Sequence, residues 1–464
     1  MPLIKSIAGA RGTIGGKIGE GLTPIDVVAL TTAFGRQLLQ QSSSKLVVIG
    51  RDARPSGAMI SHLVSATLQS LGIDVVDLGL STTPTVAIAV PQEQASGGIV
   101  ITASHNPGEW NALKLLNQAG EYIDATTAAD VFSLAAQHDH TFVGAQHLGR
   151  YLCKDGYMDE HIKQILALSL IDKAAITQKK FKVAVDAVNS TGGLAVPKLL
   201  QALGVVHITE LHCQPTGLFP HDPEPLPEHL TELADTIREG DYDLGIAVDP
   251  DVDRLAVIDE KGQAWGEDYT LVAAADHVLS QTPGNTVSNL SSSSALKDLT
   301  AQYGGSYAAS AIGEVHVVAK MKAIQAVIGG EGNGGVIYPA LHYGRDALAG
   351  IALLLSRLAR SGQTASALRA SYPSYAMVKT KIQLAPEIDT AAILDKIKSQ
   401  YSQYPIHTEE GIKVMLDKAW FHLRQSNTEP VIRIHAEGAT QESAASLLAQ
   451  VMRDIQEFMP IAVP

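Results

Sequence analysis

The sequence predicts an α/β protein of four domains: three similar domains, each built on a mixed or parallel β-sheet, and a smaller α+β C-terminal domain. A chain of 464 residues is too long for one domain of ordinary size. Short β-branched runs alternate with helical patterns along most of it. Several runs are almost continuously apolar and end at polar residues, as strands of a parallel sheet covered on both faces do. Examples are 45–49, 182–185, 244–248 and 326–328.

Helical patterns separate these runs, and this alternation predicts βαβ units. The patterns are found at 55–71, 197–203 and 268–280. The C-terminal part differs, because its two strand patterns and two helical patterns predict an α+β unit rather than a further parallel layer. The strand patterns are 378–384 and 420–423, and the helical patterns are 388–401 and 441–458. Turns near the boundaries give the domain ranges 1–155, 156–265, 266–372 and 373–464.

Composition and charge exclude several classes of protein. The hydrophobic fraction is 45%, the charged fraction 18% and the net charge −13, so the basic footprint of a nucleic-acid-binding protein is missing. Cys153 and Cys213 have no metal-like or disulfide-framework spacing. The longest apolar run, 347–355, is half of what a membrane span needs, and the N-terminus lacks a signal-peptide core. We therefore expect a cytoplasmic protein without a membrane partner.

The first informative polar run, 102–107, places Ser104 at the tip of a loop after a strand-like segment. A hydroxyl in that position is a candidate nucleophile or phosphate carrier. A serine hydrolase would need Gly-x-Ser-x-Gly, and both glycines are missing. His105 is a loop-stabilising residue, a phosphate contact or a base. Lys114 and Arg11 offer positive charge or proton transfer, although each alone would be a solvated surface residue.

The second run, 249–254, carries Asp249, Asp251 and Asp253. Three carboxylates with few other donors suit a hard divalent cation such as Mg²⁺. An EF-hand loop is disfavoured, because Arg254 occupies the sixth position, where that loop needs glycine. The alternative to a metal site is a solvated acidic loop.

The third run, 330–335, formally matches Gly-x-Gly-x-x-Gly, but the residues after it do not open a helix. The dinucleotide-binding interpretation therefore fails its structural context. The glycines instead let a backbone approach a ligand closely, and Glu331 and Asn333 present groups suited to sugar hydroxyls. A flexible turn is the competing interpretation.

The fourth run, 424–430, combines guanidinium groups, hydroxyls and backbone N–H groups, a suitable set for a phosphate dianion. Its candidate ligands, with one arginine beyond it, are Arg424, Ser426, Asn427, Thr428 and Arg433. A P-loop is missing from the sequence, so ATP or GTP hydrolysis is not supported.

These runs, in this order, resemble those of the α-D-phosphohexomutase family, which includes phosphoglucomutases, phosphomannomutases and phosphoglucosamine mutases. The likeness also includes Arg11-Gly12 and the segment 50–54, and it spans nearly the whole chain. It implies a four-domain, heart-shaped fold with the serine, metal, sugar and phosphate loops in domains I to IV. It also implies a sugar phosphate substrate and one Mg²⁺ per chain.

The resemblance further implies a mechanism. Ser104 would be phosphorylated and would give its phosphoryl group to the substrate, forming a hexose 1,6-bisphosphate that turns over and returns its other phosphate. The same bisphosphate would serve as activator. Asp249, Asp251, Asp253 and a phosphoserine oxygen would hold Mg²⁺, and Arg254 would lie beside it. Arg11 and Lys114 would assist proton transfer. Sugar hydroxyls would bind Glu331 and Asn333, and the non-reacting phosphate would bind the fourth run and Arg433.

Two departures from the common family pattern bear on sugar preference. Many bacterial relatives have Gly-Glu-x-Ser-Gly-His, so their serine and histidine correspond to Asn333 and Gly335. The serine loop continues with Trp110 and Ala112, where relatives often have tyrosine and glycine. The Gly-Asn-Gly-Gly form of the third run is similar to that of archaeal and Bacteroidetes-type phosphoglucosamine/phosphomannomutases. We expect glucosamine 6-phosphate first, with a broad phosphomannomutase/phosphoglucomutase as the alternative.

Two further functions compete with a mutase. A metal-dependent sugar phosphatase would need water to reach the phosphoserine, which a four-domain enclosure disfavours. A non-catalytic sugar-phosphate-binding protein would have no need of the nucleophile. Either a monomer or a homodimer is compatible with the sequence.

Overall fold

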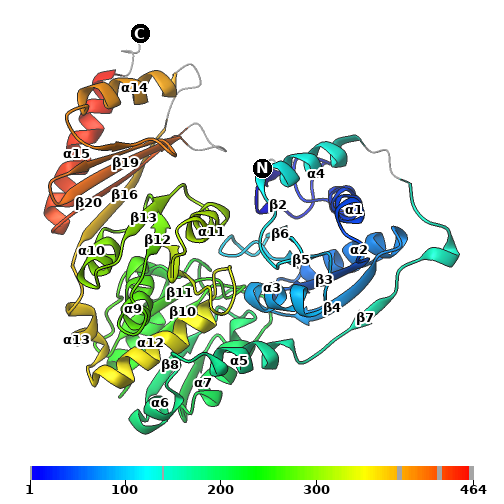
Figure 1. Ribbon diagram of the computed structural model, residues 1–464, viewed down its shortest axis with the longest axis horizontal. Coiled ribbons are helices and arrows are strands. Elements are labelled where there is room, and N and C mark those ends of the chain that lie inside the picture. The colour runs from blue at the N-terminus through cyan, green and yellow to red at the C-terminus, as the bar shows by residue number, and fades with distance from the viewer. Residues whose placement is uncertain (1–2, 138–140, 384–388, 426–430, 459–464) are drawn as a thin grey trace.

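The computed structural model describes residues 3–137, 141–383, 389–425 and 431–458. Four β-sheets follow one another along the chain, from the blue N-terminal sheet to the orange and red C-terminal one (Figure 1). Three sheets mix parallel and antiparallel strands, and the fourth is antiparallel. The predicted fold class is confirmed. The residues at which the domains meet stay a prediction.

Domain I is built on the first sheet, whose strand order is β1-β2-β6-β5-β3-β4-β7. Its elements are β1 (Ile4–Ser6), β2 (Gly9–Thr13), α1 (Pro24–Gln41), β3 (Leu46–Arg51), α2 (Gly57–Ser70), β4 (Asp74–Leu80), α3 (Thr83–Gln92), β5 (Gly97–Ile101), β6 (Trp110–Leu116), α4 (Ala125–Gln137), a 3₁₀ turn (Ala145–His147) and β7 (Tyr151–Cys153). In β3, Val47 and Ile49 pack with α1, α2 and α4, whereas Val48 packs with α3. Burial on both faces explains the continuous apolar run.

Domains II and III are two four-stranded sheets ordered β11-β10-β8-β9 and β13-β12-β14-β15. The elements of domain II are α5 (Tyr157–Ala167), α6 (Lys173–Lys179), β8 (Lys182–Asp186), α7 (Gly192–Ala202), β9 (His207–Leu211), a 3₁₀ turn (Pro227–His229), α8 (Thr231–Glu239), β10 (Leu244–Val248) and β11 (Leu255–Asp259). Those of domain III are α9 (Glu267–Leu279), β12 (Thr286–Asn289), α10 (Ala295–Gln302), β13 (Tyr307–Ser310), α11 (Glu314–Ala323), β14 (Ile328–Glu331), β15 (Gly335–Ile337), α12 (Ala347–Ser361) and α13 (Ala365–Ala370). One continuous hydrophobic core joins the two domains.

Domain IV is an antiparallel sheet ordered β16-β20-β19-β18-β17, covered by two helices (Figure 1). Its elements are β16 (Ala376–Gln383), α14 (Thr390–Gln400), β17 (Ile406–His407), β18 (Ile412–Leu416), β19 (Ala419–Gln425), β20 (Val431–Gly438) and α15 (Gln441–Phe458). Ile393 of α14 and Val451 of α15 pack onto Phe421 and Ile434 of the sheet. The other face of this sheet is free to carry polar residues.

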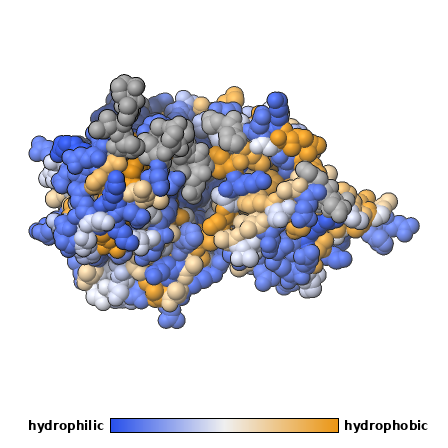
Figure 2. Space-filling model, turned by 90° about the horizontal axis from the view of Figure 1, so that it is seen from above, coloured by the Kyte–Doolittle hydropathy of each residue, from blue (hydrophilic) through white to orange (hydrophobic). Residues whose placement is uncertain are grey.

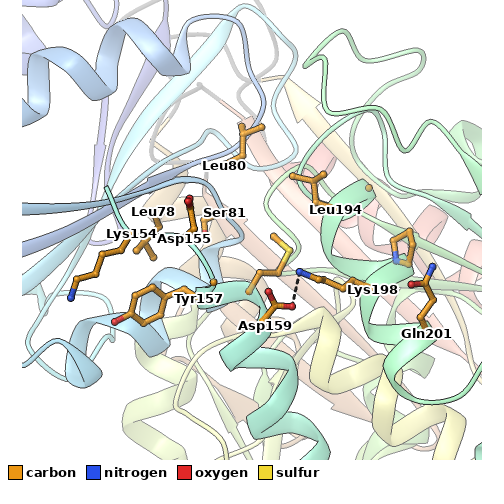
Figure 3. Close-up of a pocket in the computed structure, with 14 residues that line it drawn as sticks. Leu78, Leu80, Ser81, Lys154, Asp155, Tyr157, Asp159, Leu194, Lys198 and Gln201 are labelled. Atoms are coloured by element: carbon orange, nitrogen blue, oxygen red, sulfur yellow. Dashed lines mark ion pairs between the residues drawn. The ribbon is translucent and has the colours of Figure 1, made fainter. Parts of the chain in front are cut away.

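Domains I and II also meet around a cavity of about 480 Å³ on the linker between them. Figure 3 shows Leu78 and Leu80 of domain I opposite Leu194 and Lys198 of domain II, with Asp159 paired to Lys198. Hydrophilic side chains dominate the face seen from above, with hydrophobic residues in small groups between them (Figure 2). Within the described ranges, no helix is both long and apolar enough to cross a membrane.

Candidate active site

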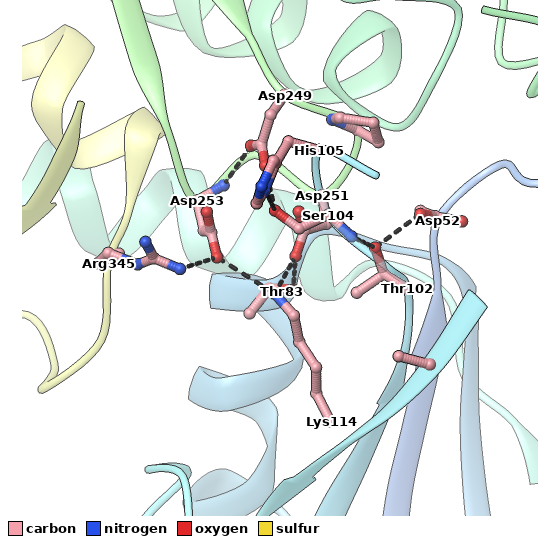
Figure 4. A network of polar contacts seen from close by, with 12 residues as sticks. Asp52, Thr83, Thr102, Ser104, His105, Lys114, Asp249, Asp251, Asp253 and Arg345 are labelled. Carbon is pink, nitrogen blue, oxygen red and sulfur yellow. Dashed lines mark hydrogen bonds and ion pairs between the residues drawn. The ribbon is translucent and has the colours of Figure 1, made fainter. Parts of the chain in front are cut away.

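Ser104 lies in the loop between β5 and β6, which is held in a strained shape. Its φ is +50°, in the left-handed region that residues other than glycine seldom adopt. The Ser104 N–H donates to Oγ1 of Thr102 over 2.9 Å, and that hydroxyl donates to Asp52 over 2.6 Å. The side chain of Ser104 is buried, and its Oγ donates to Oδ2 of Asp249 over 2.6 Å (Figure 4). The serine therefore meets the aspartate loop directly.

Arg54 fixes the shape of this loop. Its guanidinium is buried and pairs with Asp52 over 3.0 Å. The remaining N–H groups donate to backbone carbonyls of the serine loop, those of Ser104, Asn106, Pro107 and Trp110. One planar fork thus donates to four carbonyl groups of the strained loop.

The three aspartates converge in the loop between β10 and β11. All three are fully buried, and one carboxylate oxygen from each lies within 4.8 Å of the others. Val252 between them has a φ of +63°, an unusual value for a β-branched residue. Burial and the neighbouring Asp251 and Asp253 raise the pKa of Asp249 well above its ordinary value. This geometry concentrates negative charge at one point.

A divalent cation fits this loop. Among the described residues, Oδ1 of Asp251 and Oδ1 of Asp253 are buried without a hydrogen-bond partner. Buried carboxylate oxygens rarely stay unpaired, because desolvation is costly unless a donor or a cation compensates for it. An all-oxygen set of this kind suits Mg²⁺.

Lys114 of β6 reaches the same point from domain I. Its Nζ lies 2.6 Å from Oδ2 of Asp251 and 3.2 Å from Oδ2 of Asp253 (Figure 4). Burial opposes the charge on Lys114, but the attraction of the two aspartates outweighs it and raises the pKa of the ammonium well above its ordinary value. Thr83 donates to Asp251 over 2.5 Å, so α3 also contacts the loop.

Arg345 is a site residue that the sequence analysis missed. Its guanidinium is buried and forms three ion pairs: 2.7 Å to Asp253, 3.0 Å to Glu314 and 3.1 Å to Glu331. A Cβ added to Gly335 would lie only 2.3 Å from Cδ of Arg345. The long side chain of Arg345 therefore occupies the space that a side chain at position 335 would take, and Gly335 was the signal in the sequence that could have indicated it.

The third run begins within β14. Arg345 connects it to the aspartate loop, because the same guanidinium pairs with Glu331 and with Asp253. Oε1 of Glu331 accepts from Asn289 Nδ2 and from the Gly313 N–H, both over 2.9 Å. Asn333 is half-buried, and its Oδ1 accepts from the Gly335 N–H over 3.3 Å. As expected from the sequence, no helix opens directly after the glycines; the last of them begins the strand β15. Glu331 is thus positioned by domain III before any ligand binds.

Arginines of three domains lie near enough to repel one another. The pKa of Arg11 is lowered by burial and then by repulsion from Arg254 and Arg433. Arg11 donates to Asn106 over 3.3 Å, and Arg254 pairs with Glu224 over 3.1 Å. Since domains I, II and IV each contribute one of these three arginines, an anion between the domains would relieve their mutual repulsion.

The fourth run lies only partly within the described residues. Ser426, Asn427 and Thr428 are outside them. On the adjoining strands, Arg433 of β20 is directly opposite Arg424 of β19 and Lys381 of β16. Like charges in cross-strand register are destabilising, so this row favours an anionic ligand. Arg424 also pairs with Glu410 over 3.0 Å.

His105 stays close to the serine. Its Nδ1 is 3.4 Å from Oγ of Ser104. Burial, and then the charge of Arg254, lower the pKa of the imidazole well below its ordinary value. A neutral imidazole therefore faces the hydroxyl at neutral pH.

Relatives of known name match almost the whole chain. A phosphoglucomutase/phosphomannomutase of Thermococcus kodakarensis is 34% identical over 97% of this chain and 98% of its own length. A probable phosphoglucosamine mutase of Methanopyrus kandleri is 32% identical over 94% of each. The crystal structure of a phosphoglucomutase/phosphomannomutase family protein from Burkholderia thailandensis superposes with a TM-score of 0.82 at 26% identity, covering 98% of both chains.

Such relatives define the class of the protein as an isomerase that moves a phosphoryl group on a hexose phosphate. Four phosphoglucomutase/phosphomannomutase family models match in order: alpha/beta/alpha domain I at residues 5–141, domain II at 156–262, domain III at 266–375 and the C-terminal domain at 379–454. The chain belongs to this family, the α-D-phosphohexomutases.

A more distant structure shares the fold. The N-acetylphosphoglucosamine mutase of Aspergillus fumigatus has a TM-score of 0.57 at 16% identity, covering 90% of this chain and 85% of its own, and was solved in complex with GlcNAc-6P and magnesium.

Proposed function

We propose that this phosphohexomutase interconverts hexose 6-phosphates and hexose 1-phosphates through a phosphoserine at position 104 and a hexose 1,6-bisphosphate, with glucosamine 6-phosphate as its preferred substrate. The observation that carries the proposal is the 2.6 Å hydrogen bond from the buried Ser104 hydroxyl to Asp249, inside a loop of three convergent carboxylates. A hydroxyl beside a cation site and a basic group suits phosphoryl transfer.

The enzyme carries one phosphoryl group at the start of each turnover and again at its end. The bond from phosphorus to Oγ of Ser104 breaks as a bond to the free hydroxyl of the substrate forms, and the proton of that hydroxyl ends on Oγ. His105, Arg11 and Lys114 line this path and assist the proton transfer. The bisphosphate then turns over, and its other phosphate returns to Oγ by the reverse sequence. Arg345 holds the aspartate and sugar loops together throughout.

Asp249, Asp251, Asp253 and a phosphate oxygen on Ser104 would hold one Mg²⁺. The bound ion supplies positive charge that neutralises the transferring phosphoryl group. Two unpaired carboxylate oxygens and the magnesium of the Aspergillus fumigatus structure support this choice. Removal of the ion with EDTA is expected to abolish turnover and lower the melting temperature, and Mg²⁺ is expected to restore both. Unchanged activity after EDTA treatment would contradict the assignment.

Glu331 and Asn333 are proposed to bind sugar hydroxyls in either orientation of the bisphosphate. Arg254 is proposed to contact the substrate beside the cation. Domain IV would hold the non-reacting phosphate through Arg424, Ser426, Asn427, Thr428 and Arg433. The preference for glucosamine phosphate is supported by the relative from Methanopyrus kandleri, whereas the relative from Thermococcus kodakarensis supports the broad phosphoglucomutase/phosphomannomutase alternative.

A comparison of kcat/KM tests the substrate. Glucosamine 6-phosphate, mannose 1-phosphate and glucose 1-phosphate are assayed with Mg²⁺ and a trace of glucose 1,6-bisphosphate. We expect a preference for the amino sugar of about tenfold, or ~1.4 kcal/mol of differential transition-state binding. Comparable rates on all three sugars would establish the broad mutase instead. Release of inorganic phosphate without isomerisation would favour a phosphatase.

The variant S104A tests the mechanism. It is expected to lose turnover while it keeps its fold and most of its affinity for sugar phosphate. Intact-mass analysis after incubation with the bisphosphate should find one added phosphoryl group on the wild type and none on S104A. S70A, a helical serine of α2 outside the site, is the matched control. Full activity of S104A would show that another group carries the phosphate.

A further inference from the structure

A second group of ligating side chains lies in domain II. Asp186 ends β8, His212 directly follows β9, and His221 belongs to the loop after β9. Because β8 and β9 are parallel and Asp186 pairs with Leu211, their carboxyl ends meet at the same edge of the sheet. One ligand atom from each of the three side chains lies within 4.8 Å of the other two.

His221 has the orientation of a metal-ligating histidine. Its Nδ1 lies 2.8 Å from the backbone carbonyl of Asp222, so this nitrogen donates its proton to a main-chain acceptor. Its Nε2 is then presented to Oδ2 of Asp186 at 3.1 Å. In protein metal sites the ligating imidazole is held by such a hydrogen bond through its other ring nitrogen.

His212 is held at the cluster by a strained backbone. Its φ is +49°, and the facing residues Val188 and Asn189 have values of +45° and +52°. The Asn189 N–H donates to the carbonyl of His212 over 2.6 Å, which locks the two bends together. Glu232 places a further carboxylate 3.1 Å from Nε2 of His212. Non-glycine residues in this region cost free energy and persist where the surroundings fix them.

The cluster is accessible to an ion from solvent. Both imidazole side chains are 19% exposed, whereas the carboxylate of Asp186 is only 2% exposed. The two partly exposed imidazoles therefore give an ion a path from solvent to the buried carboxylate.

We propose that Asp186, His212 and His221 form a second metal site, which takes a borderline divalent ion such as Zn²⁺. Two imidazoles and one carboxylate match the ligand types of zinc rather than of Mg²⁺, which prefers oxygen ligands. This site differs in donor chemistry from the aspartate loop, and it does not depend on the function proposed for that loop.

The bound ion ties domain II to the serine loop of domain I. The segment between the two histidines crosses to domain I, where a Cβ on Gly217 would lie 1.9 Å from the carbonyl of Ala53. The guanidinium carbon of Arg54 lies 5.0 Å from the ring centroid of Phe219. An ion held by His212 and His221 fixes both ends of this segment, and so stabilises the contact with the arginine that shapes the serine loop.

Titration with Co²⁺ and Zn²⁺ in excess Mg²⁺ tests the site. Wild-type protein should bind one Co²⁺ with the intense visible absorption of a low-coordinate, imidazole-containing site, and Zn²⁺ should displace it. H212N should lose Zn²⁺ affinity by roughly 10- to 100-fold or more. Asparagine is chosen because it tolerates the left-handed backbone at this position. Zn²⁺ should also raise the melting temperature of the wild type but not of H212N.

H207N is the matched control, because His207 is an exposed histidine at the start of β9, the strand that His212 follows. It should bind both ions as the wild type does. Equal Zn²⁺ affinity in H212N and wild type would overturn the proposal. Displacement of the cobalt absorption by Mg²⁺ would also overturn it, since the ion would then belong to the aspartate loop.

Discussion

Arg345 shows how a single side chain links two loops of the candidate site. Its three ion pairs join Asp253 of the aspartate loop to Glu331 of the sugar loop and to Glu314 of α11. The planar guanidinium spreads its N–H groups over three nitrogens, so it reaches three carboxylates that come from different elements. The absence of a side chain at Gly335 leaves room for it. A ligand that contacts Glu331 is therefore coupled to the residues around Ser104.

We predict that R345K lowers kcat/KM by about 10²-fold, or ~2.7 kcal/mol, because a compact ammonium cannot reproduce the separated N–H groups with which the planar guanidinium reaches three carboxylates. Steady-state kinetics with both the 1-phosphate and the 6-phosphate measure the effect, which should be similar in the two directions. R360K is the control, since Arg360 lies on α12 and pairs with Asp172 outside the site. Wild-type kinetics in R345K would mean that the two loops are positioned without this arginine.

Most of the residues that the sequence identified share one property: they lie in polar runs that interrupt apolar patterns. Ser104 and the three aspartates are brought together because their loops follow buried strands. Arg54 and Arg345 lie outside such runs or at their edges, and their importance depends on partners 50 and 92 residues away in the chain. Spacing along a sequence contains no information on such pairs.

At the scale of elements, Asp346 joins helices from three domains. Its Oδ1 caps α12 by accepting from the Leu348 and Ala349 N–H groups, over 2.9 and 3.1 Å. Its Oδ2 lies 2.8 Å from Nε2 of His161 on α5, and Nδ1 of His161 is 3.0 Å from the hydroxyl of Thr85 on α3. Arg345 immediately precedes this cap, so the junction also fixes the backbone position from which the Arg345 side chain extends.

We predict that D346N lowers the free energy of unfolding by about 1–3 kcal/mol at pH 7, because the amide keeps the cap and loses the charged contacts. Burial opposes ionisation of Asp346, but His161 and His342 outweigh it and hold its pKa below the ordinary value. Its contribution is therefore present above the unfolded pKa of about 3.9 and is lost as the pH falls through the folded pKa. The gap between D346N and wild type should shrink below pH ~4.

Urea unfolding across this pH range measures the gap. D389N is the matched control, since Asp389 caps α14 through the Ala391 and Ala392 N–H groups. It should keep its cap as D346N does and lose only the attraction of a charged carboxylate for the helix N-terminus, about 1 kcal/mol or less. A gap for D346N that does not change between neutral and acidic pH would show that the ionised carboxylate is not the stabilising group.

Helices with a clear hydrophobic period were predictable from the sequence. The pairing of strands in the sheets was not. The pattern at 441–458 coincides with α15, and that at 55–71 contains α2. The position of β7 was not predictable, because its three residues are exposed and join the sheet only through β4. Hairpin strands such as β11 and β15 turn parallel sheets into mixed ones, and this depends on tertiary pairing.

For the whole molecule, the candidate site lies where the domains meet. Domain I contributes Ser104 and Lys114, domain II the aspartates, and domain III Glu331 and Arg345. Domain IV contributes a row of cations across three strands, with Arg433 between Lys381 and Arg424. The charge of Arg433 contributes to the lowered pKa of Arg11, so this member of the row lies toward domain I. Anionic ligands should therefore stabilise the arrangement of the four domains.

We predict that R433Q raises KM for sugar phosphates by roughly 10- to 100-fold and changes kcat much less. A charged hydrogen bond to phosphate contributes about 1.5–3 kcal/mol. A group that holds the non-reacting phosphate binds the ground state and the transition state alike, and its loss therefore appears in KM. R453Q is the control, because Arg453 is an exposed arginine of α15 in the same domain. If R433Q instead lowered kcat at unchanged KM, Arg433 would act on the phosphoryl group in transfer, and domain IV would take part in the chemical step.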